Sequence, residues 1–284
     1  MKISGDSGIV LVNKPEGLSS QQVVSRVKRI FSTKKAGHTG SLDPMATGML
    51  PVCIGRATKL CEYLLDSDKS YRAEVFLGAQ TDSGDREGKI VATAPVPALT
   101  QENIDAVLHT FLGKQSQVPP MFSALKHQGK CLYTLARSGI EIERAARPIE
   151  IYSIQCLTFS KTNLTIELRC SKGTYVRVLG EDIAKQLGTL GHLIALYRIS
   201  CAGFRESEMQ SLERLKETQK VIPIEKVLSY PHADISSGDL TQLMQGKSVH
   251  LDSALSGRFQ LLKEHRLVAV ADLLQGTVQA RKII

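Results

Sequence analysis

Residues 36–51 read AGHTGSLDPMATGMLP, and the interpretation of the whole chain starts from this stretch. Its three glycines and two prolines break both helical and strand periodicity, so it predicts a structured loop with room for one helical turn. Asp43 precedes Pro44, which favours an extended backbone, and the glycines allow a ligand to approach closely. From the pattern alone, Asp43 is either a reactive carboxylate or the cap of a helix that begins at Pro44. His38 is likewise either a residue that stabilises the loop by hydrogen bonding or a catalytic one.

Strands and helices are interleaved around this loop without regular βαβ spacing. Alternating apolar residues predict a strand from Lys69 to Ala79, with Tyr71 on its apolar face. Periodicity and capping residues predict a helix capped by Ser20 and a second helix capped by Thr100, with Leu112 inside, that ends at Gly113. The remaining predicted elements are strands at 8–12, 148–159, 163–170 and 193–200, and a helix at about 174–187. The predicted fold is mixed α/β, of the α+β type, with a largely antiparallel sheet.

Two regions differ in character from this pattern. Residues 114–146 are polar, basic in patches and weakly periodic, which predicts a protruding loop with a short helix. After Pro223, short apolar pieces alternate with glycine-containing turns. We therefore expect two domains, at residues 1–223 and 224–284, with the second small and rich in β-strands.

The positive charge of the chain is concentrated at one end. The formal net charge is +8 and the pI is about 9.2. Residues 1–60 contain nine basic and three acidic side chains, whereas residues 225–284 contain seven and six. This distribution favours a localised electropositive surface, as phosphate-binding proteins need.

Composition also argues against several other classes of protein. None of the six cysteines is in a C-x-x-C pair, and no His or Cys lies at metal-ligand spacing from His38, so we expect reduced thiols and no metal site. The N-terminus lacks the pattern of a signal peptide, and no apolar run approaches the ~20 residues that span a bilayer. We therefore expect a soluble, cytoplasmic protein that does not associate with membranes.

Arg177 is the most informative side chain outside the loop. It falls near the start of the helix predicted at about 174–187, where the helix macrodipole disfavours a cation. Either a carboxylate or phosphate lies nearby, or the arginine is simply exposed to solvent. Tyr71 and Tyr175 are by default core residues.

Five ordered segments resemble the TruB family, the bacterial tRNA pseudouridine-55 synthases. They are residues 12–15 with Gly17, 37–48, 69–71, 119–126 and 170–177. The resemblance covers roughly residues 8–200, and it departs from the family pattern without losing a reacting group. The departures are Ser41 for a common Ala, Phe122 for a common Tyr, and Tyr197-Arg198 for a frequent Arg-Arg pair.

The resemblance implies a catalytic domain of the pseudouridine synthase type, with a thumb-like RNA-binding insertion at about 114–146 and a PUA-like C-terminal domain. It implies that Asp43 is the nucleophile, that Arg177 keeps it ionised, and that Tyr71 stacks on the flipped uridine. The other implied RNA-binding residues are His38, Tyr175, Leu196 through its backbone, Lys14, Lys126 and further basic residues within 26–35 and 126–147.

The implied substrate is the T arm of tRNA, and the implied protein is a monomer that needs no protein partner. Because the reaction conserves atoms and oxidation state, no cofactor is expected, in keeping with the lack of a P-loop or dinucleotide fingerprint. The compact chain, without long basic extensions, makes a guide-RNA-dependent relative the less favoured interpretation.

Two other functions compete with this one. A non-catalytic RNA-binding protein of the same fold would function without the Asp43 carboxylate. A hydrolase with two carboxylates would need a second acid opposite Asp43. Asp82 and Asp85 are candidates for that acid, although their Thr-Asp-Ser-Gly-Asp context is typical of a turn.

Overall fold

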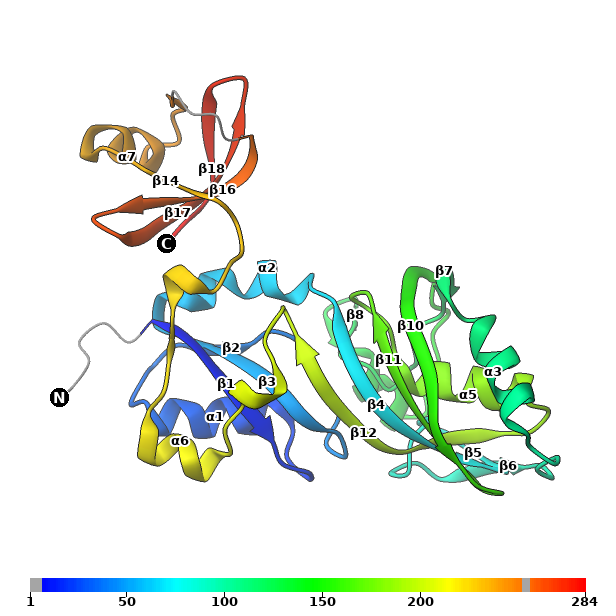
Figure 1. The fold of residues 1–284 in the computed structure, drawn as a ribbon. Coiled ribbons are helices and arrows are strands. Elements are labelled where there is room, and N and C mark those ends of the chain that lie inside the picture. The colour runs from blue at the N-terminus through cyan, green and yellow to red at the C-terminus, as the bar shows by residue number, and fades with distance from the viewer. Residues whose placement is uncertain (1–6, 252–255) are drawn as a thin grey trace.

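The computed structural model describes residues 7–251 and 256–284, and it consists of a long twisted sheet with a small β-rich unit docked near one end (Figure 1). Residues 1–6 of the first expected domain and 252–255 of the second lie outside the described residues. The division at residues 223–224 stays a prediction.

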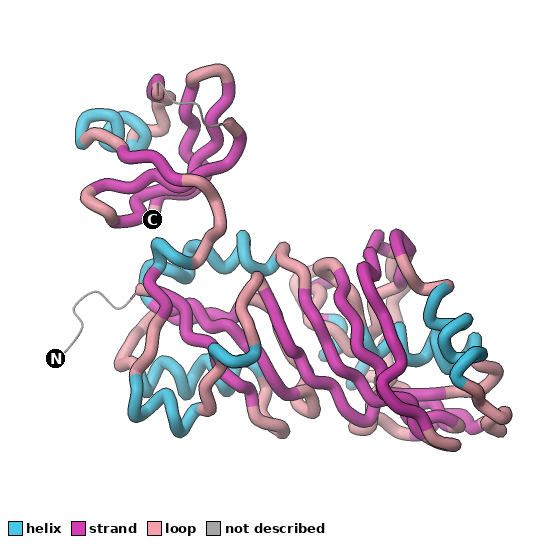
Figure 2. Tube along the Cα trace, in the orientation of Figure 1, coloured by secondary structure: helices cyan, strands magenta, loops and turns pink. Residues whose placement is uncertain are grey.

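The large sheet has nine strands within the described chain, and in Figure 2 most of them form one continuous array. Every pairing in it is antiparallel except that of β3 with β12, so the prediction of a largely antiparallel sheet is confirmed. In spatial order the strands are β13 (Ile222–Pro223), β1 (Gly8–Lys14), β3 (Thr47–Ile54), β12 (Gly191–Cys201), β4 (Lys69–Leu77), β11 (Asn163–Cys170), β10 (Arg147–Phe159) and β7 (Gly113–Gln117), with β2 (Ala36–His38) paired to β3.

Helices cover one face of this sheet because the strands alternate apolar and polar side chains. Along β4 the residues from Lys69 to Leu77 alternate between buried and more exposed positions, and Tyr71 faces the buried side as predicted. Apolar residues of this face form one core with the helices. These helices are α1 (Ser20–Ile30), α3 (Gln101–His109), α5 (Val176–Gln186) and α6 (Leu212–Thr218).

A second core lies on the opposite face, at the β1–β3 end of the sheet. Ile9 and Leu11 of β1 point into it, while Val10 and Val12 point into the first core. The 3-10 helix η1 (Gly55–Leu60) and helix α2 (Cys61–Leu65) cover this second core, together with η3 (Ile224–Lys226) and part of the C-terminal unit.

The C-terminal unit has its own core and is bound to the large sheet domain. Within the described residues its sheet has five strands, in the order β14 (His232–Asp234), β16 (Gly257–Lys263), β17 (Arg266–Leu274), β18 (Thr277–Ile283) and β15 (Val249–His250), flanked by α7 (Ser237–Met244). Arg56 donates to the carbonyl of Ile284 at 2.8 Å, and Lys59 donates to that of Ile283 at 3.0 Å. The expected small β-rich unit is therefore confirmed.

The insertion at 114–146 contains the predicted short helix, α4 (Leu132–Arg137), and a hairpin of β8 (Lys126–His127) and β9 (Lys130–Cys131). Its start differs from the prediction, because residues 113–117 form β7, which pairs with β10 at the sheet edge. Two short strands, β5 (Ala79–Thr81) and β6 (Ile90–Thr93), form a separate hairpin.

Three details of the predicted elements were wrong. Helix α1 is capped by Ser19, whose side chain accepts from the Gln22 amide while the Gln22 side chain accepts from the Ser19 amide. Residues 36–38 and 47–54 are strands, so the loop is confined to residues 39–46. Helix α3 ends at His109 and leaves Leu112 39% exposed. In each case, contacts distant in sequence or a second eligible cap overrode the local pattern.

Among residues 7–251 and 256–284, no helix combines the length and apolar character that a bilayer crossing requires.

Candidate active site

The loop of residues 39–46 emerges at the centre of the large sheet, where β3 runs parallel to β12. Thr47 and Gly48 pair there with Tyr197 and Arg198. Gly48 has a φ of +94°, and a Cβ at this position would lie 2.4 Å from the Arg198 carbonyl oxygen. Only glycine permits this close approach, which fixes where the loop leaves the sheet.

Asp43 lies in this loop against the guanidinium of Arg177. Arg177 Nε is 3.0 Å from Asp43 Oδ2, and its second terminal nitrogen is 3.4 Å from Oδ1. Arg177 is 5% exposed, whereas the Asp43 side chain is 36% exposed. The arginine therefore orients the carboxylate from the protein side and leaves its other side open to a ligand.

Two effects oppose each other at the Asp43 carboxyl. Burial raises its pKa above the usual value for aspartate, and the Arg177 guanidinium works against that rise. Arg177 is thus the main group that favours the ionised form. The expectation of a carboxylate beside this arginine, which lies in the first turn of α5, is confirmed by the contact.

Arg177 also binds Asp85, which the sequence pattern had placed in a simple turn. Arg177 Nη1 is 3.4 Å from Asp85 Oδ2 and donates to the Ser83 carbonyl at 2.7 Å. Asp85 is 4% exposed and accepts from the Ser83 hydroxyl at 2.7 Å. Asp85 does lie in a turn, as predicted, but its buried carboxylate is a second ionic partner of Arg177. A hydrolase needs an acid that faces Asp43 across open space, and Asp85 does not have this position.

Lys14 does not lie on the surface, contrary to its expected role as a phosphate contact. It is 0% exposed, and burial lowers the pKa of its ammonium to about 8. Its Nζ donates to three carbonyls, those of Pro15 at 3.0 Å, Leu18 at 2.6 Å and Pro44 at 3.1 Å. Lys14 therefore holds the backbone beside Asp43, and no phosphate can reach it in this structure.

Tyr71 is 6% exposed in β4, directly opposite Arg198 of β12. Burial raises the pKa of its phenol to about 12, and Arg198 opposes this rise. The phenol is therefore neutral at physiological pH. Its stacking on a flipped base stays a prediction.

His38 ends β2, is half-buried, and accepts at Nδ1 from the Gly40 amide at 3.3 Å. Burial lowers its pKa, and Arg198 lowers it further, so the neutral imidazole is favoured. His38 therefore supports the backbone three residues before Asp43, and its contact with RNA stays a prediction.

The other three predicted residues lie at different distances from this centre. Tyr175 precedes α5 and is fixed by Gln117, which binds both its amide at 2.8 Å and its carbonyl at 3.1 Å. Leu196 is 7% exposed in β12 and belongs to the same core as Tyr71. Lys126 is exposed in the β8–β9 hairpin, and the structure describes no contact between it and the other predicted residues. Their roles in RNA binding stay predictions.

Local sequence patterns did not identify Ser20 as a residue of this site. Its hydroxyl accepts from the Leu42 amide at 2.8 Å and donates to the Leu42 carbonyl at 3.0 Å, so it holds the residue before Asp43. Its apolar-face position in α1 was the available signal, because Ser20 lies one turn before the buried Val23 and Val24.

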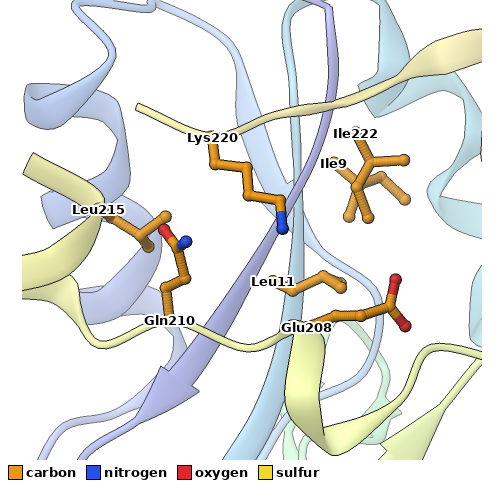
Figure 3. Close-up of a pocket in the computed structure, with 7 residues that line it drawn as sticks. All are labelled: Ile9, Leu11, Glu208, Gln210, Leu215, Lys220 and Ile222. Carbon is orange, nitrogen blue, oxygen red and sulfur yellow. The ribbon is translucent and has the colours of Figure 1, made fainter. Parts of the chain in front are cut away.

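Two other features of the structure bear on ligand binding. Among the described residues, no three His, Cys, Asp or Glu side chains converge as a metal centre would need. The pocket in Figure 3, of about 30 Å³, is lined by β1, β13 and residues around α6, and none of the predicted site residues belongs to it. Its volume suits a single water molecule.

Comparisons with known proteins identify the family of this chain. The family described as "TruB family pseudouridylate synthase (N terminal domain)" matches residues 28–176. A tRNA pseudouridine synthase B of Hydrogenovibrio crunogenus is 55% identical over 209 residues, which are 74% of this chain and 69% of the relative. One from Francisella philomiragia is 46% identical over 97% of this chain and 94% of its own length.

A solved structure shares the fold at lower identity. A chain in the crystal structure of a Cbf5–Nop10–Gar1 complex superposes with a TM-score of 0.74 and 23% identity, over 97% of this chain and 84% of that one. The matched family segment contains Asp43, Tyr71 and Tyr175, and the Francisella alignment extends the likeness through almost all of the chain. This chain belongs to the TruB family of pseudouridylate synthases.

Proposed function

We propose that this protein isomerises a uridine in the T loop of tRNA to pseudouridine, with Asp43 as its nucleophile. The observation that carries the proposal is the Asp43–Arg177 ion pair, in which a buried arginine presents a partly exposed carboxylate. The names of the relatives, tRNA pseudouridine synthase B, support tRNA as the substrate.

The reaction breaks the glycosidic bond between ribose carbon 1′ and uracil nitrogen 1, rotates the base, and joins carbon 1′ to uracil carbon 5. The proton on carbon 5 is lost and nitrogen 1 gains one, so atoms and oxidation state balance without a cofactor. Asp43 supplies the carboxylate nucleophile, and Arg177 stabilises it as an anion before attack. The neutral phenol ring of Tyr71 stacks on the base.

The target nucleotide must leave the T loop to reach Asp43, at a cost of a few kcal/mol. Exposed cations compensate part of that cost by binding phosphates. The candidates are Lys126 and the other basic residues within 26–35 and 126–147, whereas the ammonium of Lys14 is buried and cannot bind a phosphate. His38, Tyr175 and the backbone of Leu196 complete the pocket for the extruded nucleotide.

Two further parts of the proposal concern where and how the protein works. Six free cysteines and a tRNA substrate favour the cytoplasm. A monomer is sufficient for catalysis, because Asp43, Tyr71 and Arg177 all come from one chain.

Tritium release from T-arm RNA labelled at uracil carbon 5 tests the proposed reaction. We expect the wild-type protein to release tritium from the intact T arm, and to release none when the target uridine is replaced by cytidine. Failure of well-folded wild-type protein to release tritium while it binds the RNA would favour a non-catalytic RNA-binding protein instead.

A further inference from the structure

Arg198 of β12 is a fully buried arginine that contacts the loop of Asp43 on both sides. It is 1% exposed. Its guanidinium donates to the carbonyls of Gly40 at 3.1 Å and Ser41 at 3.4 Å, before Asp43, and to that of Met49 at 2.6 Å, after it. One rigid side chain therefore links the start and the end of the loop.

Arg198 differs from Arg177 in its partners. Arg177 is paired with two carboxylates, whereas among the described residues no carboxylate lies within ion-pair distance of Arg198. A buried charge without an ionic partner is costly, and here the three carbonyl dipoles compensate part of that cost. An apolar residue would avoid that cost, so stability alone is a poor reason for an arginine at this position.

The backbone around Arg198 is also adapted to the loop. Gly48 packs directly on the Arg198 backbone, where a Cβ would lie 2.4 Å from the Arg198 carbonyl oxygen. Across the sheet Arg198 is paired with Tyr71. The same residue thus adjoins both the Asp43 loop and the strand of the proposed base-stacking tyrosine.

We infer that Arg198 is a positioning residue for the isomerisation: by binding the Gly40, Ser41 and Met49 carbonyls, it sets the position of Asp43 relative to Tyr71. The inference rests on the proposed function. Arg198 acts through the loop backbone and needs no contact with the RNA. A misplacement of about 1 Å in such a group costs about 100-fold in rate.

The test compares Arg198→Met and Arg198→Lys with the wild type and with a control, Arg72→Met. Arg72 lies next to Tyr71 in β4 but on the exposed face of the strand, where it pairs with Glu167. For each protein, single-turnover tritium release at saturating T-arm RNA, RNA affinity and the melting temperature are measured.

We expect Arg198→Met to lower the single-turnover rate about 100-fold with RNA affinity within about threefold of wild type. Arg198→Lys keeps the positive charge but cannot bind all three carbonyls as arginine does, so its rate should lie between the rates of Arg198→Met and the wild type. The control Arg72→Met should have the wild-type rate. A purely structural role would lower the melting temperature while the folded fraction kept the wild-type rate.

A folded Arg198→Met or Arg198→Lys protein with a rate within about threefold of wild type would overturn the inference. If Arg198→Met does not fold, Arg198→Lys alone tests the inference. A wild-type rate in folded Arg198→Lys would then overturn it. Inactive wild-type protein would instead contradict the proposed function, so the two failures are distinguishable.

Discussion

The Asp43 loop and the 114–146 insertion are both irregular in sequence, but the structure holds them in opposite ways. Residues 39–46 are bound by Lys14 from one side and by Arg198 from the other, through carbonyls on both flanks of Asp43. In the insertion, the β8–β9 hairpin is exposed, and a hollow of about 170 Å³ lies beneath it. The contrast fits the proposed roles, in which Asp43 is held in place as the nucleophile and the exposed insertion binds RNA.

Arg177 of α5 connects the two regions. Arg177, which pairs with Asp43, also donates to the Phe122 carbonyl of the insertion at 2.5 Å. Movement of the insertion would therefore displace Arg177, which orients the Asp43 carboxylate. The comparison predicts that substitutions near the loop lower the rate of the chemical step strongly. Substitutions in the insertion should instead weaken RNA binding, and only slightly.

Apart from changes to the Asp43 carboxylate itself, the largest effect is expected for Arg177→Met. Loss of the guanidinium leaves Asp43 without its cation, and the rate of tritium release should fall about 100-fold to 1,000-fold. The RNA affinity should change little, because Arg177 is only 5% exposed. A Met variant that weakened RNA binding but kept the wild-type single-turnover rate would contradict the assigned role.

Lys14→Met should reduce stability. The substitution leaves the carbonyls of Pro15, Leu18 and Pro44 without their donor, which should lower the free energy of unfolding by about 2 kcal/mol. Urea unfolding would measure it, with Lys126→Met as the exposed control, for which we expect no significant change. Equal stability of the two variants would show that Lys14 does not stabilise the loop.

The same lysine predicts a pH dependence of stability. The pKa of Lys14 is about 8 when folded and ~10.4 in an unfolded chain, so the unfolded state binds more protons between these values. The free energy of unfolding should therefore rise with pH through this window in wild type relative to Lys14→Met. If the difference in free energy of unfolding between the two proteins narrowed as the pH rose, the lowered pKa of the buried Lys14 ammonium would be contradicted.

The smallest effect is expected for Lys126→Ala in the insertion. If Lys126 binds one phosphate, its loss should weaken RNA binding about threefold and reduce the slope of log affinity against log salt by about 1. The single-turnover rate at saturating RNA should not change. A loss of rate at saturation would mean that the insertion contributes to the chemical step.

Sequence patterns predicted the strands and helices well but predicted the buried cations poorly. The alternation of Tyr71, Ala73, Val75 and Leu77 is a local signal, and it placed β4 correctly. Lys14 follows an apolar run, and nothing nearby indicates that its ammonium binds the Pro44 carbonyl thirty residues later. Its burial depends on contacts distant in sequence.

One buried cation of the site has a local signal in the sequence of β12. Leu196 and Arg198 lie two residues apart in a strand, so both face the same way, and Leu196 is buried. That alternation predicts a buried arginine. Asp85 has no such local signal. Its turn was predicted correctly, but the turn pattern does not indicate that its carboxylate pairs with Arg177, which is distant in sequence.

Mapping of pseudouridine in a full-length tRNA, after reaction with wild-type protein and with Asp43→Asn side by side, tests the central claim most directly. The account predicts one pseudouridine, in the T loop, from the wild type, and none from Asp43→Asn at the same bound fraction of tRNA. Pseudouridine formed by Asp43→Asn, or none formed by folded wild-type protein that binds the tRNA, would contradict it.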